Sequence, residues 1–184
     1  MPQEILSSRE RRAERQMNML TCDKVSCVIS FTLNIAGPVK LNPLIRESFA
    51  EGTLEIEGKL KQNGIKVLRK EQRVEKTGCE ALFSVAYDAI GIKRMMVEIE
   101  EEHPLGRLFD IDVISKEGYP VSRAVLGFPK RRCLVCDRIA HECARAGRHH
   151  YELLQRKAGC IMQEYLHSRC GTPKKSKQHI GFEG

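Results

Sequence analysis

The apolar positions of this chain follow two periods, one of about two residues and one of about 3.6 residues. Four segments rich in β-branched and aromatic residues predict short strands: residues 25–35, 65–74, 81–87 and 108–115. Residues 42–63 instead carry a helical stripe, interrupted by glycines, and begin with Asn42 as a cap and Pro43 at the first helical position.

Further helices are predicted elsewhere. Residues 7–20 have alternating charges behind a serine cap, which is typical of a helix with a solvent-facing surface. Residues 88–102 fit a helix capped by Asp88, but apolar residues alternate with glutamates near the end of this segment, so a strand is also possible. Residues 132–146 and 149–169 predict two more helices, separated near a glycine.

The order of these elements predicts an α+β fold with a mixed sheet and a C-terminal helical hairpin. The length of 184 residues suits a single domain with a real core. We expect four parts within it: a charged N-terminal segment (residues 1–20), an α/β core (25–128), a helical pair (130–170) and a basic, disordered tail (171–184).

Composition limits the cellular setting. Hydrophobic residues make up 41% of the chain and charged residues 30%, as in ordinary globular proteins. No apolar run is long enough to span a membrane, and the first residues are charged where a secretory signal would be apolar. We therefore expect a cytoplasmic protein with no membrane partner, whose eight cysteines are reduced or metal-bound.

The net charge of +7 favours an anionic partner. Aromatic residues make up only 5% of the chain and tryptophan is absent, which leaves few platforms on which single-stranded nucleic acid could stack. A phosphate-rich small molecule or an acidic protein fits this composition as well as nucleic acid does, or better.

Two aspartates interrupt the last apolar strand segment. Asp110 and Asp112 alternate with Ile111 and Val113, and side chains two residues apart on a strand point the same way. Neighbouring carboxylates are most stable when a cation lies between them, and a hard divalent cation such as Mg²⁺ prefers oxygen ligands. The alternative is a solvated strand edge that binds no metal.

Three cysteines and a histidine have the residue types of a structural zinc site: Cys133, Cys136, Cys143 and His149. If residues 132–146 form one helix, however, Cys136 and Cys143 are separated by about 10 Å of helical rise. That separation is too large for two ligands of one zinc ion. We therefore expect the cysteines to pack inward as small apolar side chains, with zinc as the less favoured alternative.

Basic residues surround the same segment. Lys130, Arg131 and Arg132 precede the predicted helix, whose N-terminus itself favours anions, and Arg148 lies near the predicted helix–helix turn. Arginine forks match phosphate oxygens in a bidentate manner. Phosphate binding and a generic positive surface both remain open on this pattern alone.

Three strings in the chain resemble one known family. HPLGRLFDIDV (residues 103–113), RRCLVC (131–136) and CARAGRHH (143–150) are similar to the apo-citrate lyase phosphoribosyl-dephospho-CoA transferases, the CitX family of holo-acyl-carrier-protein synthases. The resemblance extends from SFTLNIAGPVK (30–40) to the end of the second C-terminal helix. The long first string makes a chance match improbable.

The resemblance implies a nucleotidyltransferase-type reaction. The donor is 2′-(5″-triphosphoribosyl)-3′-dephospho-CoA, the acceptor is a serine of the apo acyl carrier subunit of citrate lyase, and pyrophosphate leaves. Under this interpretation, Asp110 and Asp112 hold Mg²⁺ and Arg107 neutralises the pyrophosphate. Arg131, Arg132 and Arg148 then bind the dephospho-CoA phosphates. His103 either takes part in acid–base catalysis or only hydrogen-bonds the backbone of its turn.

Two other functions remain to be weighed. A nucleic-acid or zinc-binding module without catalytic activity would explain the charge and the cysteines, but it leaves the aspartates without a role. A related nucleotidyltransferase with a common nucleotide as donor would use the aspartates in the same way. Because acyl carrier proteins are usually acidic, Arg9, Arg11, Arg12 and Arg15 or the C-terminal lysines would attract the carrier under the favoured interpretation.

Overall fold

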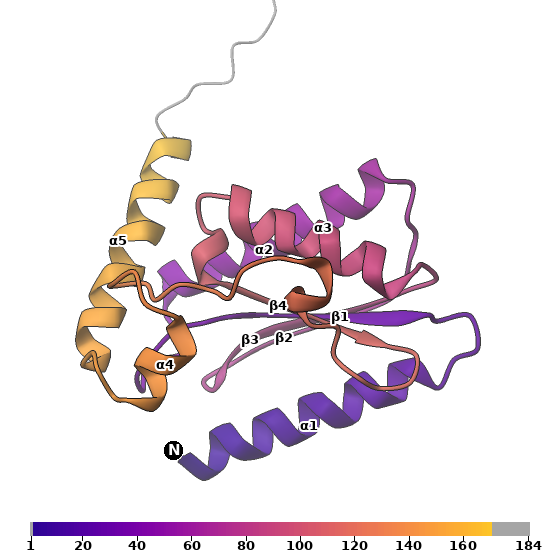
Figure 1. Ribbon diagram of the computed structural model, residues 1–184, viewed down its shortest axis with the longest axis horizontal. Helices are drawn as coiled ribbons and strands as arrows, with labels where there is room; N and C mark the ends of the chain where they lie inside the picture. Colours follow the sequence, from indigo (N-terminus) through magenta and orange to yellow (C-terminus); the bar gives the residue numbers. More distant parts are fainter. Residues whose placement is uncertain (1, 171–184) are drawn as a thin grey trace, which may run out of the picture.

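An antiparallel sheet with the strand order β2-β3-β1-β4 forms the centre of the computed structural model, which describes residues 2–170 (Figure 1). Its strands are β1 (Cys27–Leu33), β2 (Val67–Glu75), β3 (Gly78–Val85) and β4 (Phe109–Ser115). The described helices are α1 (Pro2–Leu20), α2 (Pro43–Gln62), α3 (Ala89–Glu102), α4 (Ala140–Arg145) and α5 (Tyr151–Cys170), with short 3₁₀ turns η1 (Gly106–Leu108) and η2 (Arg123–Leu126).

These elements confirm the α+β class and the positions of the four predicted strands. The prediction of a mixed sheet was wrong, because all three pairs of neighbouring strands are antiparallel. Residues 88–102 form a helix rather than a strand, and the Asp88 carboxylate accepts the Gly91 N–H as its cap (2.6 Å). Asn42 caps α2 in the same way, by accepting the Ile45 N–H at 2.8 Å.

One face of the sheet carries the main hydrophobic core and packs against α2 and α3 (Figure 1). The Phe31 ring stacks on Phe49 of α2, with centroids 5.1 Å apart, and meets the edge of Phe109 of β4 at 5.3 Å. Helix α2 approaches this closely because Gly52 has no side chain: a Cβ atom there would lie 2.4 Å from the Phe31 ring. The glycine that interrupts the helical stripe therefore has a packing role.

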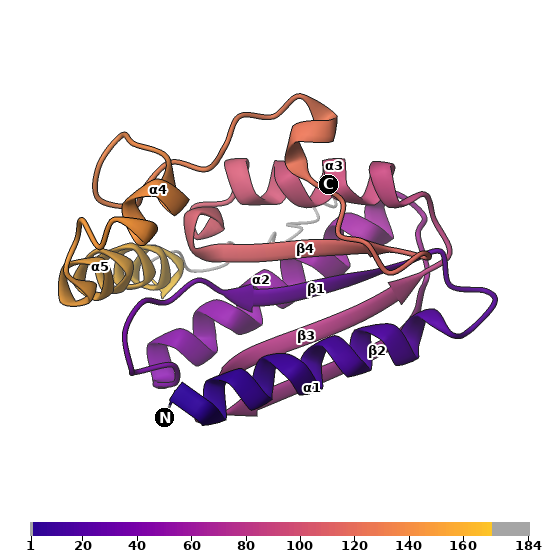
Figure 2. The ribbon, with the colours of Figure 1, turned by 60° about the horizontal axis from the view of Figure 1, so that its bottom comes forward.

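Helix α1 lies across the opposite face (Figure 2). A small apolar cluster fixes its C-terminal end, formed by Met19, Leu20, Val25, Val28, Leu82 and Ile114. Further toward its N-terminus the contacts are polar, since Arg12 and Arg15 pair with Glu80 and Gln16 donates to the Ser30 hydroxyl at 2.8 Å. These contacts accompany the burial of Ser30 and Glu80 between the sheet and α1.

The C-terminal region differs from the predicted helical hairpin. The expected helix over residues 132–146 is wrong in its first half, where Arg132 and Ile139 form a β-bridge. Cys133 N–H donates to Arg138 O and Ala140 N–H to Arg131 O, so these backbone groups bond across a loop instead of along a helix. Only the six-residue α4 remains of that helix.

Helix α5 matches the second predicted helix and packs against α2, where Tyr165 Oη donates to the Glu51 carboxylate at 3.4 Å. The predicted disordered tail, residues 171–184, lies outside the described residues. No helix in the described part of the chain is long and apolar enough to cross a membrane.

Candidate functional site

Strand β4 presents both aspartates on the face that α1 covers. Asp110 lies opposite Thr32 and Asp112 opposite Ser30 in the register with β1, so both carboxylates are on the same side of the sheet, as predicted. Phe109, Ile111 and Val113, which alternate with the aspartates along β4, point into the main core. Asp112 is exposed, and Asp110 is half-buried.

A small pocket adjoins Asp110 on this face, which we call the aspartate pocket. It has a volume of about 150 Å³, and its charged lining residues are Arg9, Arg12, Lys40, Glu80 and Asp110. Arg12 is held over the sheet by its ion pair with Glu80, 3.8 Å away. The predicted exposed arginine face of α1 is therefore only partly free, because Arg12 and Arg15 both fold onto the sheet to reach Glu80.

The pKa of Asp112 is raised above its ordinary value. Partial desolvation is the main cause and the neighbouring Asp110 carboxylate adds to it, while Lys93, Arg12 and Arg131 act in the opposite direction. The side chain nevertheless stays open to solvent. A carboxylate in this position gains from an additional cation and accepts a proton more readily than an ordinary aspartate.

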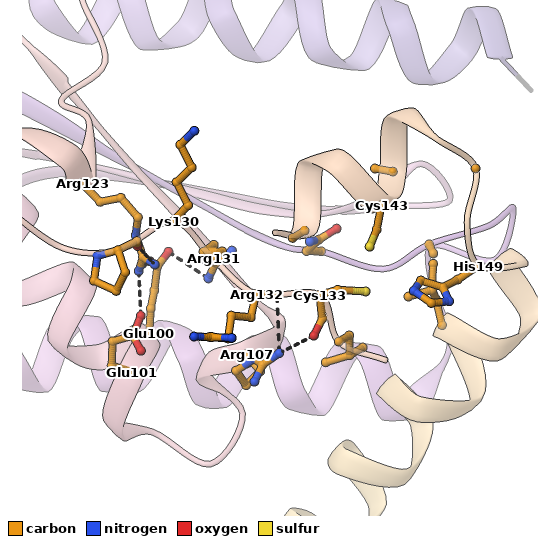
Figure 3. Close-up of a pocket in the computed structure, with 18 residues that line it drawn as sticks. Glu100, Glu101, Arg107, Arg123, Lys130, Arg131, Arg132, Cys133, Cys143 and His149 are labelled. Carbon is orange, nitrogen blue, oxygen red and sulfur yellow. Dashed lines mark hydrogen bonds and ion pairs between the residues drawn. The ribbon is translucent and has the colours of Figure 1, made fainter. Parts of the chain in front are cut away.

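A larger cavity opens beside the start of β4, with a volume of about 460 Å³ (Figure 3). We call it the arginine cavity, because its cationic lining residues are Arg107, Arg123, Lys130, Arg131 and Arg132. Apolar groups complete the wall, among them Ala36, Pro129, Leu134 and Leu154. Cations around a partly apolar hollow suit a ligand that combines phosphates with an organic portion.

Glu100 organises the arginines at one end of this cavity. Its carboxylate pairs with Arg123 at 3.0 Å and with Arg131 at 3.2 Å, and it accepts the Ile111 N–H at 2.9 Å. Burial raises the pKa of Glu100, and the nearby Arg131 is the main opposing influence. Glu100 stands in an acidic run at the end of α3, yet it is only 5% exposed.

The spacing of residues along α3 already indicates that Glu100 is buried. Ile92, Met96 and Glu100 are spaced four residues apart, so Glu100 continues the buried stripe of α3. A carboxylate in an apolar stripe requires partners, and here they are Arg123 of η2 and Arg131 of the loop that follows it.

Arg131 connects the arginine cavity to the aspartate pocket. Its guanidinium lies 3.6 Å from Asp110 Oδ1, pairs with Glu100 and also donates to the Phe109 carbonyl. Asn34 lines both the arginine cavity and the aspartate pocket. Asp110 and the cationic cavity therefore belong to one continuous region, and Asp112 lies next to Asp110 on the same face of β4.

The other predicted phosphate-binding residues divide into two groups. Arg107 and Arg132 line the arginine cavity and are exposed, and Arg107 Nη2 donates to Cys133 O at 2.9 Å (Figure 3). Arg148 is exposed and does not line the cavity, although its neighbours Gly147 and His149 do. Its backbone N–H ends α4 by donating to Cys143 O at 3.1 Å.

His103 lines neither the arginine cavity nor the aspartate pocket. Its Nδ1 atom accepts the Leu105 N–H at 3.0 Å, and its ring stacks on Phe109 at a centroid distance of 5.1 Å. Burial lowers the pKa of His103, so the ring is neutral near pH 7. Of the two roles considered for this residue, these contacts favour the turn that hydrogen-bonds its own backbone.

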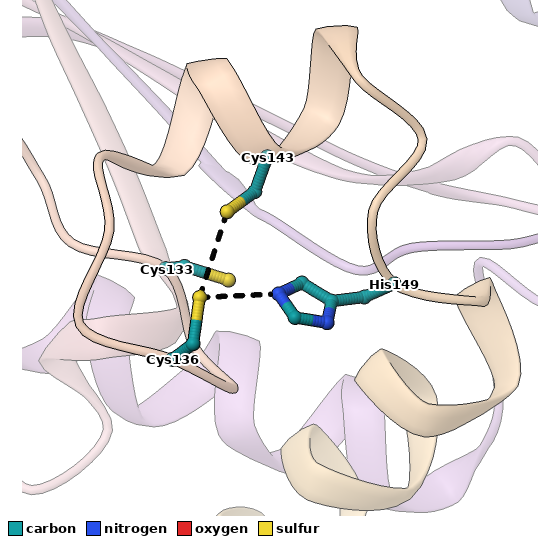
Figure 4. Close-up of side chains that lie close together, drawn as sticks. All are labelled: Cys133, Cys136, Cys143 and His149. Atoms are coloured by element: carbon teal, nitrogen blue, oxygen red, sulfur yellow. Dashed lines mark hydrogen bonds between the residues drawn. The ribbon is translucent and has the colours of Figure 1, made fainter.

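The three cysteines and His149 come together (Figure 4), and all of them except Cys136 line the end of the arginine cavity away from Glu100 (Figure 3). The Sγ atoms of Cys133, Cys136 and Cys143 and a ring nitrogen of His149 all lie within 4.8 Å of one another, an arrangement compatible with zinc. The geometric objection to zinc was wrong, because it assumed a continuous helix that the loop over residues 133–139 replaces. Within residues 2–170, this is the one cluster that brings together three or more side chains of the metal-ligand types.

The arginine cavity combines cations and an apolar wall next to the Asp110 carboxylate, a lining that suits a polyanionic ligand with an organic portion. The family model for apo-citrate lyase phosphoribosyl-dephospho-CoA transferase (CitX) matches residues 2–165, and the chain belongs to that family.

Curated relatives lead to the same family. A protein of Vibrio cholerae named probable apo-citrate lyase phosphoribosyl-dephospho-CoA transferase is 37% identical over 163 residues, which is 88% of this chain and 91% of the relative. A Citrobacter koseri protein with that name, without the qualifier, is 37% identical over 146 residues, 79% of each chain. An Escherichia coli protein so named is 36% identical over the same length.

Proposed function

We propose that this protein attaches the phosphoribosyl-dephospho-CoA group to the apo acyl carrier subunit of citrate lyase. The acceptor serine oxygen attacks the α-phosphorus of the triphosphoribosyl donor, a phosphodiester bond forms, and the bond to the β-phosphate breaks to release pyrophosphate. Membership of the family and the names of the relatives support the substrates. The observation that carries the proposal for this chain is the link through Arg131 between the cationic cavity and Asp110.

The arginine cavity suits the donor. Its cations, including Arg107 and Arg132, can bind the triphosphate, and its apolar wall can accept the organic part of dephospho-CoA. Arg107 and Arg131 face the charge that develops on the leaving pyrophosphate, and donors held in place before the reaction are effective at this step. Backbone and carboxylate contacts hold both guanidinium groups.

The aspartates suit the reacting end of the donor. Asp110 and Asp112 present carboxylate oxygens on the same face, the ligand type that Mg²⁺ prefers, and their mutual repulsion is relieved by a cation. When bound there, Mg²⁺ would neutralise charge on the polyphosphate. Asp112 is our candidate for accepting the serine proton, since its pKa is raised and its side chain is open to solvent.

The carrier subunit would approach from the α1 side. Arg9 and Lys40 line the aspartate pocket next to Asp110, and Arg9 is exposed at the same end of α1. Acyl carrier proteins are generally acidic, so basic residues around the aspartates would orient the carrier with its serine toward Asp112.

The decisive experiment measures the intact mass of the apo carrier subunit after incubation with donor, Mg²⁺ and this protein. We expect the mass to rise by one phosphoribosyl-dephospho-CoA group, with one pyrophosphate released per modified carrier. A carrier whose acceptor serine is changed to alanine serves as the matched control and should stay unmodified.

Donor specificity is tested in the same assay. Replacing the triphosphoribosyl donor by ATP, CoA or dephospho-CoA should give no mass change. Transfer from ATP would identify a nucleotidyltransferase with a common donor, and an unmodified carrier with a donor preparation that the Citrobacter koseri relative uses would refute the proposal.

A further inference from the structure

We infer that Cys133, Cys136, Cys143 and His149 bind one structural zinc ion, which holds the wall of the arginine cavity in place. The four ligand atoms come from three separate pieces of chain: the loop that the Arg132–Ile139 bridge closes, the helix α4 and the turn between α4 and α5 (Figure 4). The inference concerns a metal site and does not depend on which group the protein transfers.

Two of the distances between ligand atoms are close to those of a tetrahedral zinc site. Cys136 Sγ lies 3.6 Å from Cys143 Sγ and 3.2 Å from His149 Nε2. A tetrahedron with Zn–S bonds of about 2.3 Å has sulfur atoms about 3.8 Å apart. A disulfide would require a bond of about 2.05 Å, well below the separation of these thiols.

The loop that holds the first two cysteines is already shaped for a metal. Cys133 N–H donates to Arg138 O at 2.7 Å, which closes the loop and turns Cys136 back toward Cys133. The Val135 N–H points at Cys133 Sγ, with the nitrogen at 3.5 Å, so the sulfur receives a backbone donor of the kind that stabilises a thiolate. Outer hydrogen bonds of this kind orient metal ligands.

Apart from Leu134, which packs against the main core, the same segment adds little to the hydrophobic clusters. Cys143 is the only buried residue of α4, and neither Cys133 nor Cys143 belongs to the hydrophobic clusters of the described chain. A six-residue helix has no stability of its own in water. Four protein ligands with no open position are typical of structural zinc, whose binding energy stabilises the fold directly.

The position of the cluster links a bound metal to the shape of the arginine cavity. Cys133, Cys143 and His149 line the arginine cavity, and the chain enters the cluster directly from Arg131 and Arg132. Arg107 donates to the carbonyl of Cys133 itself at 2.9 Å. A zinc ion in the cluster therefore fixes the backbone that carries or orients three of the cavity's arginines.

Metal analysis of the untagged protein tests this inference. We expect about one zinc per chain, retained in Cys160→Ser, which changes an exposed cysteine of α5, and lost in Cys136→Ser. Replacing zinc by Co²⁺ in the wild-type protein should give the intense visible absorption of tetrahedral thiolate coordination. A chain that purifies with well under one zinc and cannot take up Zn²⁺ or Co²⁺ when reduced would overturn the inference, as would equal zinc in Cys136→Ser and Cys160→Ser.

Hydrogen exchange of the wild-type protein before and after chelation covers the case in which a variant fails to fold. Removal of zinc should increase exchange in residues 130–150, while the strands β1 and β4 stay protected. Binding of inorganic tripolyphosphate should weaken in parallel. Exchange that is unchanged in residues 130–150 would show that the metal does not hold this wall, whatever the outcome of the transfer assay.

Discussion

The Nη1 atom of Arg131 lies 3.6 Å from Oδ1 of Asp110, and this contact joins the cationic cavity to the aspartates of β4. The same guanidinium pairs with the buried carboxylate of Glu100. The planar, forked guanidinium directs one nitrogen to each carboxylate, Nη1 to Asp110 and Nη2 to Glu100, whereas a lysine would have to meet both with a single nitrogen. These contacts predict that the transfer reaction requires arginine at position 131.

We expect Arg131→Lys to lower the rate of carrier modification by about 100-fold, because one positioned donor to the developing charge is lost. Rates are measured by the mass shift of the carrier at saturating donor. The matched control is Arg94→Lys, since Arg94 is an exposed residue of α3 outside both hollows, and it should keep the wild-type rate. Equal rates for the two variants would exclude Arg131 from the reaction.

The aspartates are tested by Asp110→Asn and Asp112→Asn, which keep the shape of each side chain but remove its charge. We expect each variant to lose at least about 100-fold in transfer rate, and to need more Mg²⁺ for half-maximal activity. Asp23→Asn, in an exposed loop, is the control. Near-normal transfer by both β4 variants, with folding intact by circular dichroism, would remove these residues from catalysis.

Because His103 is partly buried, we expect the free energy of unfolding to depend on pH. Burial lowers its pKa in the folded protein below the value of about 6.5 for an exposed histidine. As pH falls below that value, the unfolded chain takes up a proton that the folded chain does not, so this residue lowers the free energy of unfolding progressively toward the folded pKa.

The measurement compares urea unfolding of wild type and His103→Asn. The asparagine oxygen can still accept the Leu105 N–H, but it does not titrate. From about pH 7.5 to about pH 5.5, we expect the wild type to lose more stability than the variant. A transfer rate for His103→Asn within a few-fold of wild type at neutral pH would match the structural role, whereas a loss comparable to that of the aspartate variants would restore a catalytic one.

Gly106 and Gly58 form a matched pair for stability. A Cβ at Gly106 would lie 2.4 Å from the backbone oxygen of Glu100 and 2.7 Å from that of Ile99, so the end of α3 would have to move. We expect Gly106→Ala to destabilise the protein by about 1–3 kcal/mol. Gly58 of α2 has no atom within 4 Å of the same position, and Gly58→Ala should stabilise the helix by about 0.5–1 kcal/mol. Chemical unfolding of both variants checks the opposite signs.

Much of the fold followed from local patterns. The strand at residues 108–115 and the caps at Asn42 and Asp88 were predicted because hydrophobic period and capping chemistry are properties of neighbouring residues. The predicted helix over residues 132–146 failed for the same reason. Residues 137–142 (DRIAHE) contain no glycine or proline that would break a helix locally. The loop that forms instead is held by hydrogen bonds between its two ends.

The sequence by itself determined that Asp110 and Asp112 share one face of a strand, since a period of two leaves them no other arrangement. It also determined the family, through strings such as HPLGRLFDIDV. The tertiary structure decided which distant groups meet: Glu100 with Arg131, Arg131 with Asp110, and three cysteines with His149. These contacts depend on the paths of loops over the sheet edge, and a loop's path is fixed by partners far along the chain.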